Sequence, residues 1–279
     1  MTASTSGPDA AAGLRDRLGR AGLFLWSGWS GLAALALIAA GWQAGHEAYG
    51  DFILPAPLAV LRRALAILAA PDNIALALQT GRRAAEGLAL SVGIGTLGGV
   101  IAGYAPAILR MMRPFLTVLL GVPPIAWIVL AMIWFGNGDG TVRLTVLVAA
   151  TPVVLAGAAE GIVTRDRGLD MMAQAFGAGP LRRFLTLGLR QLGAHFFPAL
   201  VLALATAFKV AVMAELLANA GGIGGELAEA RSNFDIEGAL AWVLIGVSLL
   251  IATEYGLVQP VRAELDRWRA AARPWGVKR

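Results

Sequence analysis

The sequence LTVLVAATPVVLAGAAEGIV, residues Leu144–Val163, contains a single charged side chain, Glu160, in its 20 positions. About 20 mostly apolar residues are what an α-helix needs to cross the hydrocarbon core of a bilayer. Similar runs recur along the chain, which is 57% hydrophobic and 15% charged, whereas soluble domains are about 25% charged. The composition therefore argues against a soluble enzyme, a nucleic-acid-binding protein or a disordered chain, and it predicts an all-α polytopic membrane protein.

Six apolar runs predict six transmembrane helices in one domain over residues 21–258, between tails at 1–20 and 259–279. The expected spans are Ala21–Gly45, Glu86–Tyr104, Pro114–Phe135, Leu144–Val163, Gly193–Ala218 and Ile236–Val258. The third run contains Pro123 and Pro124. Proline removes helix hydrogen bonds, and it is tolerated in a membrane only where protein or a cavity satisfies the freed carbonyl groups. The third span is therefore expected to be interrupted at this pair.

The positions of the basic residues predict the orientation of the chain. Lys and Arg accumulate in the cytoplasmic loops of membrane proteins. With a cytoplasmic N-terminus, 16 of the 23 Lys and Arg residues lie on the cytoplasmic side, six lie on the other side, and Lys209 lies within a span. Both termini are thus expected in the cytoplasm. The net charge of +5 then reflects topology and a partner surface, and it gives no evidence for nucleic-acid binding.

A glycine-rich stretch of the second span has two interpretations. Residues 93–98 match the G-x-G-x-x-G pattern of dinucleotide-binding folds, but the pattern needs a preceding strand and a later acidic residue that this stretch lacks. Four small residues also recur at every fourth position, which places them on one helix face where another backbone can come close. These residues are Ser91, Gly95, Gly99 and Gly103. We therefore predict helix packing at this face.

Residues that carry enzyme chemistry are scarce in this sequence. There is no cysteine, and the two histidines, His46 and His195, are far apart in the sequence and have no acidic residues at metal-ligand spacing. Neither of the two lysines follows the glycines of a phosphate-binding loop. The sequence therefore predicts no catalytic residue, no metal site and no cofactor in this chain.

The longest predicted cytoplasmic loop, residues 164–192, carries five arginines and also apolar residues at helical spacing. The spacing on each side of the turn at 177–180 predicts two short helices. Their apolar face has to be buried. It can lie on the bilayer surface with the arginines at the headgroups, or it can dock a cytoplasmic partner, and the pattern leaves both alternatives open.

Lys209 and Glu215, both in the fifth span, are candidates for a translocation path. Ionisable groups at membrane depth are costly and usually face a bundle interior or a wet pathway. Six residues apart on a helix, the two are separated by about 120° and about 9 Å, so they are not expected to pair. The alternatives are a neighbouring carbonyl or acid for Lys209 and the external interface for Glu215. Pro123, Pro124 and Trp127 are further path candidates, although aromatic residues at this level also serve as interface anchors.

Several stretches resemble the permease subunits of binding-protein-dependent ABC importers. They are TGRRAAEG at 80–87, PPIAWIVLAMIWFG at 123–136, AELL at 214–217, GGIGG at 221–225, ARS at 230–232 and LPAPLAVL at 54–61. Within that superfamily they are most similar to the nitrate/sulfonate/taurine branch, and the likeness covers about residues 50–268. The resemblance implies a type I importer-like bundle in the bacterial inner membrane. It further implies a second permease copy or a paralogue, two cytoplasmic ATPase subunits that hold ATP and Mg, and an extracytoplasmic solute-binding protein.

The resemblance also gives the 164–192 loop a role. In the family this loop inserts a short helix, with the pattern Glu-Ala-Ala and a later glycine, into the ATPase. The aligned residues are Asp170, Met171, Met172, Ala173, Gln174, Phe176 and Gly177. Met171 stands where the family has glutamate, and Arg190 stands where it has proline after leucine. These departures mark either a divergent subfamily or a specialised half of a permease heterodimer.

The expected function is the permease subunit of an ATP-driven importer, which forms the path for a small solute. Lys209 favours an anionic solute such as a sulfonate, nitrate, bicarbonate or an aromatic carboxylate, and a neutral vitamin precursor stays open as an alternative. The alternative is a stand-alone ion-coupled secondary transporter, for which six spans without a detectable internal repeat are unfavourable. A membrane enzyme is disfavoured by the shortage of catalytic residues.

Overall fold

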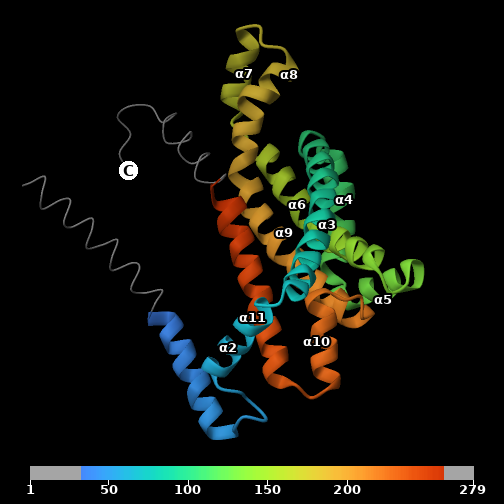
Figure 1. Cartoon of the computed structure of the whole chain (residues 1–279). Helices are drawn as coiled ribbons and strands as arrows, with labels where there is room; N and C mark the ends of the chain where they lie inside the picture. The colour runs from blue at the N-terminus through green and yellow to red at the C-terminus, as the bar shows by residue number, and fades with distance from the viewer. Residues whose placement is uncertain (1–32, 261–279) are drawn as a thin grey trace, which may run out of the picture. The chain divides into compact units, whose positions relative to one another are not determined.

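The structure, a computed structural model, describes residues 33–260. Within that range every regular element is a helix (Figure 1). The chain divides into two units, Met1–Leu61 and Arg62–Arg279. The expected cytoplasmic tail at 1–20, the beginning of the first expected span and residues 261–279 lie outside the described residues.

The first unit contains a helix at residues 33–49 and the beginning of α2 (Pro57–Leu68). Two side chains of the helix bind the backbone of the connecting segment. Trp42 Nε1 donates a hydrogen bond to the carbonyl of Pro55 at 2.9 Å, and His46 Nδ1 lies 2.9 Å from the carbonyl oxygen of Leu54. The proline-rich stretch that follows the first expected span is thus held against the end of this helix.

The second unit contains the remaining helices. They are α3 (Pro71–Tyr104), α4 (Pro106–Gly121), α5 (Pro124–Phe135), α6 (Asp139–Val163), α7 (Arg167–Ala175), α8 (Pro180–Arg183), α9 (Leu189–Ala218), α10 (Gly222–Ser232) and α11 (Ile236–Thr253). Four segments are long and apolar enough to cross a membrane: Pro71–Tyr104, Asp139–Val163, His195–Ala218 and Ile236–Gly256. The pair α4 and α5 makes a fifth if it is counted as one broken span. The described residues therefore account for four or five of the six expected spans.

The interruption expected at Pro123 and Pro124 is confirmed. Helix α4 ends at Gly121, α5 begins at Pro124, and the two helices are bent by 90° at the break. Proline lacks the N–H that would continue the ladder of α4, and it restricts the residue before it to extended conformations. Val122 is accordingly extended, with a ψ of 124°.

Helix α3 begins at Pro71, 15 residues before the expected start of the second span at Glu86. The charged pair Arg82–Arg83, expected outside the span, lies within this longer helix, where Asp139 of α6 pairs with each arginine. At about 1.5 Å per residue the 34 residues of α3 extend over about 50 Å, more than the thickness of a hydrocarbon core.

Helix α6 packs against both α3 and α9. The four small residues of the α3 repeat, Ser91, Gly95, Gly99 and Gly103, are all buried at the contact with α6. A Cβ atom on Gly99 would lie only 2.6 Å from the Cβ of Ala158. Only a residue without a side chain permits this approach, so the glycines set the distance between the two backbones.

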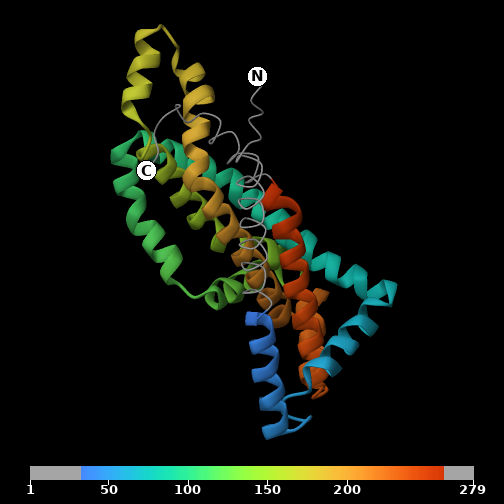
Figure 2. The ribbon, with the colours of Figure 1, turned by 90° about the vertical axis from the view of Figure 1, so that its left-hand side faces the viewer.

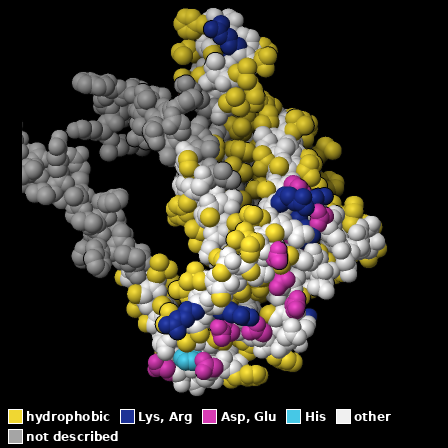
Figure 3. Space-filling view, in the orientation of Figure 1, with side chains coloured by type: hydrophobic (Ala, Val, Ile, Leu, Met, Phe, Trp, Pro, Cys, Tyr) yellow, Lys and Arg dark blue, Asp and Glu magenta, His cyan; other side chains and the backbone are white. Residues whose placement is uncertain are grey.

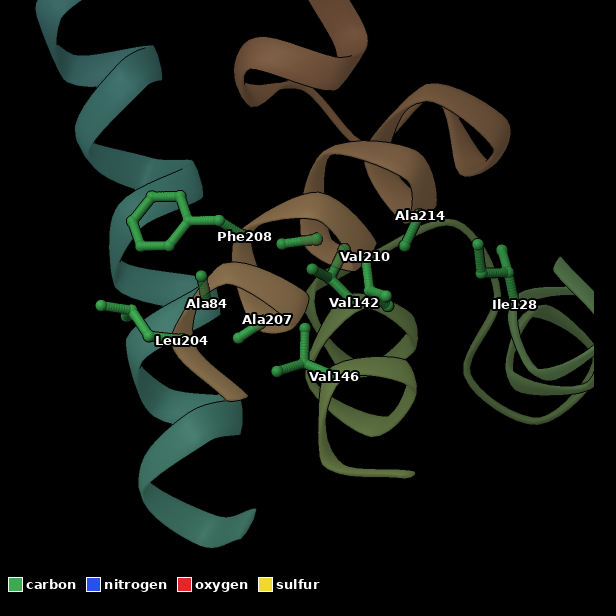
Figure 4. Close-up of a cluster of buried hydrophobic side chains, with 10 residues drawn as sticks. Ala84, Ile128, Val142, Val146, Leu204, Ala207, Phe208, Val210 and Ala214 are labelled. Atoms are coloured by element: carbon green, nitrogen blue, oxygen red, sulfur yellow. The ribbon is translucent and has the colours of Figure 1, made fainter. Parts of the chain in front are cut away.

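The main apolar core lies where α3, α5, α6 and α9 meet. Figure 4 shows Ala84 of α3, Val146 of α6, Ile128 of α5 and Phe208 of α9 in this cluster. Outside the core, hydrophobic side chains cover much of the visible face (Figure 3). Leu97 of α3 is one of the exposed apolar residues of the bundle. An exposed apolar surface of this kind suits contact with lipid.

Figures 1 and 2 show which elements lie at the ends of the second unit. Helices α7 and α8 lie at one end, and α10 lies at the other, beside the ends of α9 and α11. The expected cytoplasmic loop and α10 are therefore at opposite ends of the bundle.

Candidate translocation and coupling sites

A buried ion pair joins α3 to α9 at the end of the bundle that carries α10. Arg83 Nη1 donates to Glu215 Oε1 at 2.8 Å, and Arg83 Nε donates to Asp139 Oδ1 at 2.8 Å. Arg83 is 3% exposed and Glu215 is 0% exposed. The guanidinium also donates to the carbonyl of Ala220 at 2.9 Å. Planar guanidinium groups suit such multiple contacts, and charges at this depth need them.

The second carboxylate oxygen of Glu215 is also occupied. Thr80 Oγ1 donates to Glu215 Oε2 at 2.7 Å, and the N–H of Gly224 donates to the same oxygen at 3.1 Å. The N–H of Ile223 donates to Thr80 Oγ1 at 2.8 Å. A Cβ on Gly222, where φ is +70°, would clash with Glu215 and Thr80. The glycines of the GGIGG stretch thus allow α10 to begin against this carboxylate.

Sequence reasoning identified Glu215 but missed its partners. It expected no pair between Glu215 and Lys209, and the pair that forms is with Arg83 instead. It did not identify Thr80, Arg83 or Asp139. A signal was present, because Thr80 and Arg83 lie three residues apart and so share one helix face. Their partner on α9 lies more than 130 residues away, which only the fold could reveal.

Lys209 lies on another face of α9, in a pocket of about 260 Å³ between α9, α10 and α11. The other residues of the lining are apolar: Ala205, Phe208, Val212, Ile223, Leu227, Val243, Gly246, Val247 and Leu250. Within residues 33–260, no carboxylate lies within ion-pair distance of Lys209. Lys209 is exposed, and it contributes the single charged side chain to the lining of this otherwise apolar pocket.

The three other path candidates surround the break between α4 and α5. Pro123 is exposed, while Pro124 and Trp127 are half-buried. The indole Nε1 of Trp127 is buried and has no hydrogen-bond partner among the described residues. The structure places none of the three in the Lys209 pocket. Their role in a path stays a prediction.

A polar hollow of about 310 Å³ lies between α10 and the beginning of α11. Glu226, Glu229 and Asp235 contribute carboxylates to it, and Arg63 contributes a positive charge. Burial raises the pKa of the Glu226 carboxyl, and the negative charge of Glu229 raises it further. This end of the bundle therefore presents a polar surface, unlike the apolar pocket around Lys209.

The predicted helix–turn–helix in the 164–192 loop is present as α7, a turn and α8. Asp166 caps α7 by accepting from the N–H groups of Gly168 and Leu169. Gly177 forms the turn with a φ of +79°, a conformation that side chains disfavour. Asp170 pairs with Arg183 at 3.4 Å across the turn. The two helices are thus held together by their own charges.

The aligned coupling residues lie mostly on the surface of this hairpin. Phe176 is 85% exposed and Met171 is 64% exposed. Met172, Gln174 and Gly177 are exposed as well, and Asp170 and Ala173 are half-buried. At its base, Arg165 lies over the ring of Tyr104, 4.5 Å from the centroid. The hairpin is therefore attached to α3 at its base and presents apolar side chains at its tip.

The described residues contain no group of three or more His, Asp or Glu side chains that could hold a metal ion. Polar groups meet in the buried network, but each serves to join helices. We assign no catalytic residue.

Comparison with known proteins shows that this sequence is similar to one family of transport proteins. The sequence pattern of the family "Binding-protein-dependent transport system inner membrane component" matches residues 95–257. A Bacillus subtilis (strain 168) transport permease named for aliphatic sulfonates is 26% identical over 253 residues, which cover 87% of this chain and 88% of that protein. The taurine transport system permease protein of Escherichia coli (strain K12) is 24% identical over 245 residues, with coverage of 85% and 88%.

A third relative, the nitrate import permease protein of Leptolyngbya laminosa, is 25% identical over 188 residues, with coverage of 67% and 66%. The match of the family pattern takes in α6, the α7–α8 hairpin and α9 through α11, which carry most of the features described above. Its length exceeds half of the chain, and the spans and the loop occur in the expected order. The chain therefore belongs to the binding-protein-dependent transport family of the bacterial inner membrane, as an ABC importer permease of the nitrate/sulfonate/taurine branch rather than an enzyme.

Proposed function

We propose that this chain forms the translocation path for a small anionic solute, which a binding protein delivers from outside and two cytoplasmic ATPase subunits drive inward with ATP and Mg. A second permease copy or a paralogue completes the path. The main support for this proposal is the exposed apolar tip of the α7–α8 hairpin, which includes Phe176 and Leu181. An exposed apolar surface of this kind favours contact with another protein.

The direction of the hairpin favours a protein partner over the bilayer surface. In Figures 1 and 2, α7 and α8 continue in the direction of α9 and do not turn across the end of the bundle. A helix that lies on a membrane runs in the plane of the interface. Phe176 and Leu181, at 85% and 70% exposure, therefore point to an apolar cleft on a cytoplasmic partner.

The hairpin is continuous with α9, one of the three helices that line the Lys209 pocket. From α8 the chain passes through a π-helical turn at Phe184–Gly188 directly into α9, which carries Lys209. Movement of the hairpin by an ATPase would therefore be transmitted along α9 to the pocket. Rocking of a bundle around a central site is how alternating access proceeds in many transporters.

Replacement of Gly177 by valine is expected to weaken the complex with the ATPase. A Cβ at this position meets no atom within 4 Å, so the effect arises from the positive φ alone. A β-branched residue in that conformation costs at least about 1–2 kcal/mol. We expect the turn to change and the amount of co-purified ATPase and the rate of ATP-driven uptake to fall together.

Gly179→Val is the matched control. Gly179 also has open space at its Cβ, but its φ is −64°, which valine adopts readily. The Gly179→Val variant should therefore assemble with the ATPase and take up solute as the parent does. Full assembly and uptake in Gly177→Val would refute the coupling role of the hairpin, and uptake by the permease without any ATPase would favour an ion-coupled carrier instead.

Lys209→Ala is expected to raise the KM for an anionic solute about tenfold or more, since a hydrogen bond to a charged group contributes about 1.5–3 kcal/mol. The assay is uptake into proteoliposomes that hold the permease, ATPase and binding protein, with nitrate, ethanesulfonate and benzoate as probes. The probe that the parent transports is then used for the variants.

Two variants control this experiment. Lys209→Arg keeps the positive charge and should retain most of the affinity. Met213→Ala removes an exposed side chain from the same helix, outside the pocket lining, and should leave KM unchanged. An unchanged KM in Lys209→Ala, or a loss of ATPase assembly equal to the loss of uptake, would show that the lysine is structural.

A further inference from the structure

The buried network around Glu215 reaches α10 as well as α3. Two helix-starting N–H groups, those of Ile223 and Gly224, donate to Thr80 Oγ1 and Glu215 Oε2. The first N–H groups of a helix have no partner within the helix. Side chains from α3 and α9 supply the partners here. The position of α10 is therefore set by residues that are distant from it in the sequence.

One of the residues held in this way, Ile223, also lines the Lys209 pocket. Ile223 and Leu227 lie one helical turn apart on α10, and both line that pocket. The N–H that donates to Thr80 belongs to Ile223 itself. A shift of α10 would therefore move these two side chains relative to Lys209 and change the width of the pocket.

The hydrogen bonds that join Thr80, Arg83 and Glu215 to one another and to the beginning of α10 favour a single position of that helix. Thr80 Oγ1 accepts from Ile223 and donates to Glu215, while Arg83 binds the other oxygen of the carboxylate. Thr80, Arg83 and Glu215 are all buried. Release of α10 would leave polar groups unpaired away from water, which is unfavourable.

We propose that Thr80, Arg83 and Glu215 are positioning residues for transport, which fix α10 so that Ile223 and Leu227 form a constant wall of the Lys209 pocket. None of the three lines the pocket, so they act through α10. The proposal rests on the proposed function, because that function assigns the pocket to the solute.

The first arm of the test measures the position of α10 without transport. The sequence contains no cysteine, so Ala228→Cys, at a buried site of α10, introduces a single thiol. Thr80→Val keeps the shape of the side chain and removes the hydroxyl. Thr80→Val removes two buried hydrogen bonds, of which the one from the N–H of Ile223 holds α10. We expect a water-soluble maleimide to label the thiol about tenfold faster in this variant, since loss of that bond changes the local opening equilibrium of α10 by about that factor.

Two controls accompany the labelling. Thr80→Ser keeps the hydroxyl and should restore the slow rate of the parent. Thr145→Val removes another fully buried hydroxyl, which bonds only to Thr141 of its own helix at 2.7 Å, and should not change the rate. If Thr80→Val does not accumulate in the membrane, the smaller Thr80→Ala removes the same hydrogen bonds and replaces it.

The second arm measures uptake in the proteoliposomes described above, with the probe that the parent transports. Thr80→Val should raise KM about as much as it raises the labelling rate, with a smaller change in maximal rate, and Thr80→Ser should reverse the effect. Slow labelling in Thr80→Val would show that the hydroxyl of Thr80 does not fix α10. Fast labelling with an unchanged KM would show that the position of α10 does not affect the Lys209 pocket. Failure of the proposed function is a separate result, because it appears as an unchanged KM in Lys209→Ala.

Discussion

Replacement of Arg83 by methionine is expected to lower the free energy of unfolding by about 3–5 kcal/mol, because removal of one member of a buried ion pair leaves the other charge uncompensated. Glu215 would keep its bonds from Thr80 and Gly224 but lose its counter-charge at a site of 0% exposure. The carbonyl of Ala220 would lose its donor as well. Reversible denaturation of the purified protein in mixed micelles measures the change.

Arg143→Met is the matched control for this substitution. Arg143 pairs with Glu86 and with Asp139, but its side chain is 37% exposed. Ion pairs with access to solvent contribute about 0–1 kcal/mol. Equal losses in Arg83→Met and Arg143→Met would show that burial of the Arg83–Glu215 pair does not raise its contribution to the free energy of unfolding.

Gly99→Leu is expected to cost about 3 kcal/mol through overpacking. The side chain would project into the contact between α3 and α6, where a Cβ already lies 3.0 Å from the amide nitrogen of Ala159. Backbone atoms cannot move aside as the end of a flexible side chain can, so the two helices must separate. Thermal unfolding monitored by tryptophan fluorescence should show the loss as a lower Tm.

Gly93→Leu tests the same substitution on the same helix without the contact. Gly93 is exposed, and a Cβ there meets nothing within 4 Å. Since leucine has a higher helix propensity than glycine by about 0.7–1 kcal/mol, this variant should be as stable as the parent or slightly more stable. A large loss in Gly93→Leu, or none in Gly99→Leu, would contradict the assignment of the packing face.

Most of the membrane architecture could be predicted from local sequence. Apolar length predicts the spans because a hydrocarbon core of fixed thickness selects for it, and the break at Pro123–Pro124 follows from the missing N–H group of proline. The α7–α8 hairpin follows from apolar spacing on both sides of Gly177. Each of these features depends on residues that are close together in the chain.

The beginning of α3 was not predictable in the same way. Arg82 and Arg83 end the hydrophobic run, so hydropathy places the start of the span after them. The helix continues through them because Asp139 and Glu215 neutralise these charges. Those carboxylates belong to other helices, and hydropathy of one segment carries no information about them.

The sequence was enough to establish a polytopic helical membrane protein, its interrupted span and its hairpin, because a bilayer and the backbone impose these on any chain with such periodicity. Only the tertiary structure decided what Glu215 does. Its ion pair with Arg83 and the hydroxyl of Thr80 join segments more than 130 residues apart, and such pairing exists only after α3, α6, α9 and α10 have packed. The physical reason is that burial sets the energy of a charge, and burial is a property of the assembled bundle.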